Sequence, residues 1–115
     1  MIRRIATCAG SILFCASLFA GAAAAAQDKD AKGDADKGKA TFEQCSMCHN
    51  VDSPEKKMGP SLQGMYKKKT LANGKPVNDA NVLAQINAGG NGMPGYADQL
   101  SAQEKADLLA YLHTI

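Results

Sequence analysis

The stretch Cys45-Ser46-Met47-Cys48-His49 has the largest consequences for the fold of this chain. Two cysteines three positions apart on a helical turn project toward the same side, so both sulfurs can bond to one flat organic group. His49 follows at once, and a ring nitrogen can then coordinate a metal at the centre of that group. The pattern C-x-x-C-H is the attachment signal of c-type haem.

Three other uses of these side chains explain the sequence less well. A thioredoxin-like dithiol expects a βαβ context, and a structural zinc site needs four ligands. Cys45, Cys48 and His49 provide three, and the second histidine, His113, lies near the C-terminus. A disulfide between the two cysteines would close a very small loop and stabilise the fold little. The pattern therefore predicts one haem c, covalently bound through Cys45 and Cys48.

Residues 1–26 have the pattern of a cleavable secretory signal. They carry Arg3 and Arg4 and no acidic residue, continue as an apolar run, and end in five alanines. Cleavage after Ala26 would also remove the formal net charge of +2, and a neutral chain argues against nucleic-acid binding. The alternative is an uncleaved membrane anchor, since the apolar run is long enough to span a bilayer. We expect cleavage and export to the periplasm, and membrane association only if the segment is retained.

The rest of the chain divides into a polar lead-in, residues 27–33, and one small domain, residues 34–115. The lead-in has little to bury and is expected to be disordered. The domain has no Trp, and its aromatic residues are Phe42, Tyr66, Tyr96 and Tyr111. Small domains with so few large side chains are often completed by a cofactor.

Helical patterns recur along the domain. Asp34 is expected to cap a helix over residues 35–44, and a short helix is expected over residues 61–68. Asp79 is expected to cap a third helix, which stops at Gly89 and the glycine that follows it.

The last helix has the clearest signal. Ser101 and Glu104 form a capping box, and Leu108, Tyr111 and Leu112 then give one apolar stripe. Strand patterns are nearly absent, because the few β-branched residues never alternate with polar ones. The predicted fold is all-α, with three to five helices and long loops wrapped around the haem.

The haem iron has a second axial position, for which the candidate ligands are Met47, Met58, Met65, Met93 and His113. Met47 lies inside the attachment motif and cannot reach the opposite face, and methionines such as Met58 or Met65 are more often core residues than ligands. Met93 lies in the glycine-rich stretch Gly89–Gly95, where the backbone can come close to a flat ligand. Met93 is therefore the predicted sixth ligand.

The order of these motifs resembles that of the class I c-type cytochromes over about residues 34–115. The matching positions are Gly38, Phe42, Cys45-x-x-Cys48-His49, Gly59-Pro60-x-Leu62, Gly92-Met93-Pro94, Leu108 and Tyr111. The resemblance implies that the first and last helices cross, with Gly38 at the close approach. It also implies that the carbonyl of Pro60 accepts a hydrogen bond from the ring of His49, and that Met93 is the sixth ligand.

The sequence departs from the mitochondrial-type members in its lack of Trp and in its shorter middle region. The groups that hold the haem propionates are therefore not assigned by the resemblance. Tyr66 and Tyr96 are candidates, with Lys or Asn side chains as alternatives.

A haem with both axial positions filled has no vacancy for oxygen or peroxide, which leaves outer-sphere electron transfer. We expect a monomeric periplasmic electron carrier rather than an enzyme. Three alternatives stay open: a gas-binding or peroxidase-like haem protein with a labile sixth position, an electron-transfer subunit of a dehydrogenase or oxidase complex, and a haem-free dithiol or metal module.

Between Lys56 and Asn78 there are six lysines and no acidic residue, namely Lys56, Lys57, Lys67, Lys68, Lys69 and Lys75. Acidic residues gather instead at 28–36 and 98–107, so the domain should carry a dipole. The lysines form either an ordinary solvated face or a surface that steers an acidic redox partner toward the haem edge.

Overall fold

The computed structural model describes residues 32–115, so the predicted signal and most of the predicted lead-in lie outside the described residues. The elements are α1 (Ala35–Phe42), the single 3-10 turn η1 (Met65–Lys67), α2 (Asp79–Ala88) and α3 (Ala102–Leu112). Residues 32–115 contain no strand, only two isolated β-bridges. The all-α prediction with long loops is confirmed.

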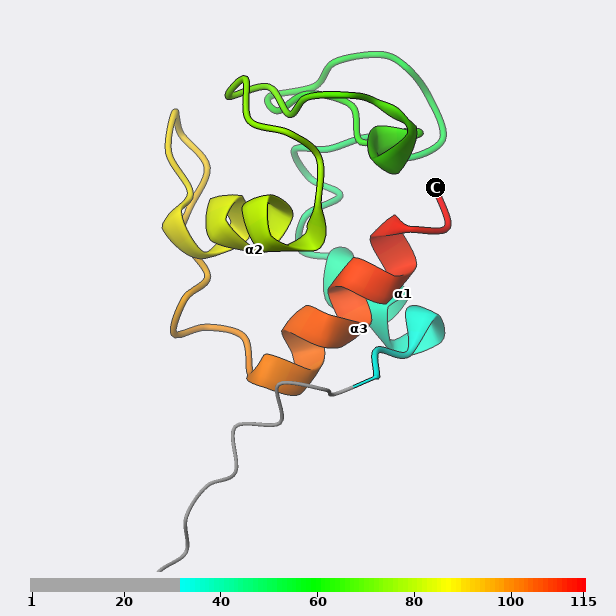
Figure 1. Ribbon diagram of the computed structural model, residues 1–115, viewed down its shortest axis with the longest axis vertical. Coiled ribbons are helices and arrows are strands. Elements are labelled where there is room, and N and C mark those ends of the chain that lie inside the picture. The colour runs from blue at the N-terminus through cyan, green and yellow to red at the C-terminus, as the bar shows by residue number, and fades with distance from the viewer. Residues whose placement is uncertain (1–31) are drawn as a thin grey trace, which may run out of the picture.

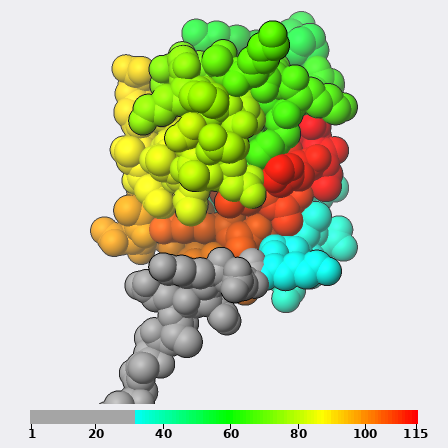
Figure 2. Space-filling model, viewed as in Figure 1, coloured from blue at the N-terminus to red at the C-terminus, as the bar shows by residue number. Residues whose placement is uncertain are grey.

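In Figure 1, α1 and α3 cross in the lower part of the domain, and α2 lies to one side. The long connection from α1 to α2 passes over the top. Figure 2 shows this connection (green) and α2 (yellow-green) closing over one side of α3 (orange to red). The C-terminus ends near η1 (Figure 1).

Two of the predicted helix starts are confirmed. The side chain of Asp34 accepts hydrogen bonds from the first turn of α1. At the start of α3, the backbone N–H of Glu104 donates to Ser101 Oγ at 3.1 Å, and the N–H of Ser101 donates to Glu104 Oε2 at 2.7 Å. This closed capping box satisfies two backbone donors that the helix itself leaves free.

The predicted cap of the third helix is wrong by one position. Asn78 caps α2, because its backbone is extended and its side chain accepts a hydrogen bond from the N–H of Asn81 at 2.8 Å. Asp79 is instead the first helical residue, where its negative carboxylate still interacts favourably with the positive end of the helix dipole. The helix ends before Gly89, as predicted.

Two predicted helices are shorter in the structure. The expected helix over 61–68 is reduced to η1, because Gly64 just before it has a left-handed backbone with φ of 62°. The first helix ends at Phe42 rather than at residue 44. Its last turn tightens there, since the N–H of Glu43 donates to the carbonyl of Ala40 at 3.3 Å.

The crossing of α1 and α3 depends on a buried glycine. A Cβ atom on Gly38 would overlap the carbonyl oxygen of Asp107 and would lie 2.8 Å from Cβ of Tyr111. Beside this contact the rings of Phe42 and Tyr111 pack with their centroids 5.4 Å apart. The two helix backbones can approach this closely only because position 38 has no side chain.

A buried carboxylate fastens the start of α1 to α3. Asp107 is only 3% exposed, and its Oδ1 accepts hydrogen bonds from the backbone N–H of Asp34 and from Nε2 of Gln103, both at 2.8 Å. The bond from Asp34, and then that from Gln103, holds the pKa of Asp107 below its usual value. The charge is thus compensated by one hydrogen bond from the start of α1 and one from within α3.

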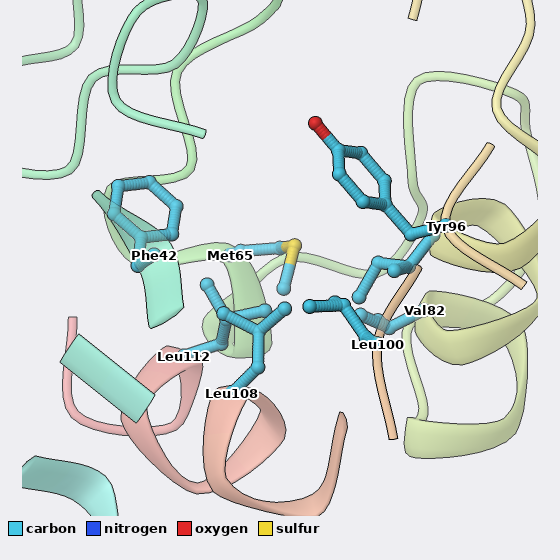
Figure 3. Packing of buried hydrophobic residues seen from close by; sticks show 8 residues of the cluster. Phe42, Met65, Val82, Tyr96, Leu100, Leu108 and Leu112 are labelled. Carbon is cyan, nitrogen blue, oxygen red and sulfur yellow. The ribbon is translucent and has the colours of Figure 1, made fainter. Parts of the chain in front are cut away.

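The core is one apolar cluster between α3, η1 and α2. Figure 3 shows Met65, Leu108, Leu112 and Leu100 converging, with Val82 and the ring of Tyr96 on the α2 side. Other side chains are partly buried against this cluster, among them Cys45 and Met93. The attachment motif and the predicted sixth ligand therefore contact the same core.

We predict that Gly38→Ala destabilises the protein by about 1–3 kcal/mol, the usual range for overpacking. Alanine is the better helix former by about 1 kcal/mol, so steric overlap at the crossing must reverse the normal sign of this substitution. Denaturant unfolding of the holoprotein would measure the change. The control Lys39→Ala, on the exposed side of α1, should have little effect, and a raised midpoint for Gly38→Ala would contradict the close approach.

Candidate functional site

The attachment motif lies in a series of tight turns that continue from α1. The N–H of Cys45 donates to the carbonyl of Phe42 at 2.7 Å, and the N–H groups of Cys48 and His49 donate to the carbonyl of Cys45 at 3.1 and 3.0 Å. These bonds wind the motif into a helix-like turn, which is the conformation that places both sulfurs on one side. Both cysteines are partly buried, and neither is paired in a disulfide.

The surroundings of Cys45 favour an uncharged sulfur. Burial raises the pKa of the Cys45 thiol, and the neighbouring Cys48 raises it further. Burial also raises the pKa of Tyr96, and the two nearby cysteines raise it further. A thioether carries no charge, so an environment that disfavours a thiolate does not disfavour a sulfur bonded to porphyrin. The sulfurs and their surroundings fit covalent haem.

His49 is held by the loop that returns to it. Its Nδ1 lies 2.8 Å from the carbonyl oxygen of Pro60, and the N–H of Gly59 donates to the carbonyl of Cys48 at 2.8 Å. A proton on Nδ1 would be donated to Pro60, which leaves Nε2 as the nitrogen that can bind a metal. The contact that the sequence resemblance implied is thus present in the structure.

Gly59 is the close neighbour that this arrangement requires. A Cβ atom at position 59 would lie 2.5 Å from Cε1 and 2.8 Å from Nδ1 of the His49 ring. The glycine therefore lets the backbone lie flat against the imidazole.

Met93 is presented by a compact turn between α2 and Tyr96. Gly89, Gly90, Asn91 and Gly92 have positive φ angles of 64°, 114°, 54° and 89°, and three of the four are glycines, which adopt such angles without strain. The turn is closed by two backbone hydrogen bonds between Gly90 and Met93, of 2.9 and 3.1 Å. Met93 is thereby turned back toward the core, against which it is partly buried.

The other candidate ligands lie in places that suit them less well. Met47 and Met58 are 79% and 82% exposed, and Met58 lies on the cysteine side, with Sδ 3.9 Å from Sγ of Cys48. Met65 is 6% exposed within the core. Nε2 of His113 lies 2.8 Å from Oδ1 of Asp79 at the end of α3. Met93 remains the predicted sixth ligand.

Tyr66, one candidate for holding a propionate, is engaged elsewhere. Its hydroxyl donates to Oδ1 of Asp79 at 2.5 Å, and its ring stacks on that of His113 with centroids 3.6 Å apart. Burial, followed by the bond to Asp79, raises the pKa of Tyr66. Sequence reasoning missed this cluster, because the three residues belong to different elements and no local pattern connects them.

The surface of the described residues has two notable hollows. One of about 280 Å³ adjoins Pro60 and is lined by Leu62, Met65, Lys68 and Leu71 among others. It lies beside the loop that holds His49, and its lining is mostly apolar, with Lys68 as the one charged residue. A second, of about 710 Å³, lies between α2 and α3, and its lining includes none of the predicted site residues.

Two features are absent from residues 32–115. No group of three or more His, Cys, Asp or Glu side chains is arranged to hold a bare metal ion. Within the same residues, no helix has both the length and the apolar character needed to cross a membrane.

Comparisons with known sequences agree with this geometry. The family model described as "Cytochrome C oxidase, cbb3-type, subunit III" matches residues 33–112. The chain is 34% identical over 86 residues to "Cytochrome c-553-like" of Synechocystis, covering 73% of this chain and 71% of that protein. It is 27% identical over 92 residues to "Cytochrome c2 iso-1" of Magnetospirillum molischianum, covering 64% and 92%.

Two solved structures have a similar fold. Cytochrome c6 from the diatom Phaeodactylum tricornutum matches with a TM-score of 0.55 and 27% identity, covering 71% of this chain and 93% of that one. Cytochrome cH from Methylobacterium extorquens matches with a TM-score of 0.55 and 23% identity, covering 72% and 100%. At that identity, the second match speaks for the fold alone.

We predict that Gly59→Ala displaces the His49 ring and weakens its bond to Pro60. The imidazole would become a less basic ligand, so the ferric state would be less stabilised and the reduction potential would rise. A rise on the order of 30–60 mV corresponds to a three- to tenfold change for one electron. Voltammetry of the holoprotein measures it, with Gln63→Ala, an exposed position nearby, as control; a potential that is unchanged or lowered would count against the arrangement.

Proposed function

Since this chain belongs to the class I c-type cytochromes and is a haem-based electron carrier with covalently bound haem c, we propose that it works in the periplasm with iron held by His49 and Met93. The ligand assignment is supported by the way in which the chain holds these two side chains. The His49 ring is oriented by Pro60 at 2.8 Å, and Met93 is turned against the apolar cluster that Cys45 also contacts.

The haem supplies a one-electron couple between ferric and ferrous iron. The protein contributes two thioether attachments at Cys45 and Cys48, and an imidazole whose tautomer is set by the Pro60 carbonyl. A thioether ligand from Met93 favours the ferrous state and raises the reduction potential relative to a second histidine. Because both ligands would be held by the chain, neither redox state would require a new ligand.

Export is supported by the signal pattern of residues 1–26. A second candidate is an electron-transfer subunit of an oxidase complex, which the description of the matching family model favours. Fractionation of the native cell separates the two. A free carrier would be released with the periplasm and would elute as a monomer, whereas a subunit would remain with a membrane complex.

We predict that Met93→Ala abolishes the charge-transfer absorption band that a methionine sulfur gives with ferric iron. The variant should also bind carbon monoxide rapidly in the ferrous state and have a lower potential, while the wild type should resist carbon monoxide. Absorption spectra in both redox states are the measurement. Met58→Ala, at an exposed methionine, is the matched control and should keep the band.

Survival of the band in Met93→Ala would overturn the assignment. Its loss in Met65→Ala alone would transfer the ligand role to Met65. Rapid binding of carbon monoxide by the wild type would instead favour a gas-binding or peroxidase-like protein.

The six lysines predicted to contact a partner are all exposed in the structure, namely Lys56, Lys57, Lys67, Lys68, Lys69 and Lys75. The first two lie beside the attachment turn, where Nζ of Lys57 donates to the carbonyl of Ser46 at 2.8 Å. We propose that these lysines steer the exposed edge of the haem site to an acidic redox partner.

We predict that changing Lys67, Lys68 and Lys69 together to Gln slows electron transfer to a carboxylate-terminated monolayer on gold by about threefold or more at low salt. The difference should disappear at high salt, where surface charges are screened. The matched control changes Lys32, Lys37 and Lys39, which lie at or beside α1, and should have a smaller effect. Equal slowing by both triple variants would show a response to net charge rather than to this surface.

A further inference from the structure

The four methionines among residues 32–115 fall into two classes of exposure. Met65 is 6% exposed and Met93 is partly buried against the core. Met47 and Met58 are 79% and 82% exposed, and they are the exposed large apolar side chains in this part of the chain. Single exposed apolar residues are ordinary on a protein surface, but here two exposed thioethers lie in or beside the same attachment motif.

Met47 and Met58, hereafter the methionine pair, lie at the edge where the haem is attached. Met47 is between the two cysteines in sequence, and Sδ of Met58 is 3.9 Å from Sγ of Cys48. The segment that carries Met58 is tied to the attachment turn, because the N–H of Gly59 donates to the carbonyl of Cys48 at 2.8 Å. The exposure of Met58 is therefore a property of a hydrogen-bonded loop rather than of a loose end.

We propose that hydrogen peroxide oxidises the methionine pair to sulfoxides in preference to Met65 and Met93, and that this oxidation weakens docking of the redox partner. The part on docking rests on the proposed function. In the reaction the O–O bond of peroxide breaks and one oxygen atom bonds to the thioether sulfur. The sulfur loses two electrons, and the other oxygen leaves as water with both protons.

Selectivity follows from access. Peroxide reaches an exposed sulfur directly, whereas Met65 is only 6% exposed and belongs to the apolar cluster shown in Figure 3. Met93 is partly covered by the same cluster, and a sulfur bonded to iron would also have one lone pair engaged. Oxidation can thus change the surface at the attachment edge and leave the iron ligands as they are.

The consequence for docking follows from the change in polarity. A thioether is apolar and deformable, and covering it with a partner is favourable because apolar surface is removed from water. A sulfoxide is polar and must lose bound water on contact. Lys56 and Lys57 are exposed immediately before Met58, so an acidic partner that presents an apolar spot among its carboxylates is the occupant that fits this surface.

The first experiment treats the holoprotein with hydrogen peroxide and follows each methionine by peptide mass mapping over time. Met47 and Met58 should gain one oxygen atom about tenfold faster than Met65 and Met93, as expected from their exposure. The charge-transfer band of ligated methionine should persist while the pair is converted. Oxidation of Met65 or Met93 at the same rate as the pair would overturn the proposal.

The second experiment compares electron transfer to a mixed carboxylate- and methyl-terminated monolayer before and after peroxide. It is done at high salt, where steering by lysines is screened. The wild type should lose about threefold or more of its rate after treatment, and methionine sulfoxide reductases should restore it. The double variant Met47→Leu with Met58→Leu should keep its own untreated rate, because leucine is apolar but is not oxidised.

Met65→Leu is the matched control, since it removes a buried methionine and leaves the pair in place. It should lose rate as the wild type does. An equal proportional loss in the double leucine variant would contradict the role in docking. The peptide map does not depend on partner docking or on the identity of the sixth ligand, so failure of the selectivity is distinguishable from failure of the proposed function.

Discussion

The close crossing of α1 and α3 is the constraint on which the rest of the structure depends. Gly38 lets the two backbones touch, and the helix that contains it leads directly into the turn that carries the cysteines. Asp107, through its bond to the N–H of Asp34, fixes the start of the same helix. The attachment turn therefore begins from a helix held at its start and at its centre, which directs Cys45 toward the core.

Irregular backbone does most of the positioning at the site. The loop that reaches Gly59 and Pro60 orients the imidazole of His49, and the glycine-rich turn before Pro94 orients Met93. Both loops satisfy much of their backbone hydrogen bonding locally, so they need no sheet or long helix for support. Loops of this kind are uncommon in small domains unless they hold something, and here they surround the attachment of a haem.

The surface divides into faces of different chemical character. Cys45 and Met93 contact the apolar interior, whereas the edge beside Cys48 exposes two methionines and two lysines. The proposed iron ligand Met93 is thus partly buried, whereas the proposed contact edge is exposed. The methionines of residues 32–115 thus have different proposed roles, and they differ in how deeply each side chain is buried.

The elements that could be predicted from the amino-acid sequence are those whose signals are local. The cysteine–histidine motif, the capping box at Ser101 and the glycines after α2 each act through neighbours within a few residues, so the attachment site and two helix boundaries could be predicted. The cap of α2 was missed by one residue, since Asn78 and Asp79 are both good caps and only the extended backbone of Asn78 decides between them. Only the tertiary structure decided which methionines are exposed, and it also directed the Tyr66 hydroxyl to Asp79 instead of leaving it for a propionate. The physical reason is that burial and contacts such as that of Tyr66, Asp79 and His113 arise between segments far apart in the chain, and no local pattern of residues encodes them.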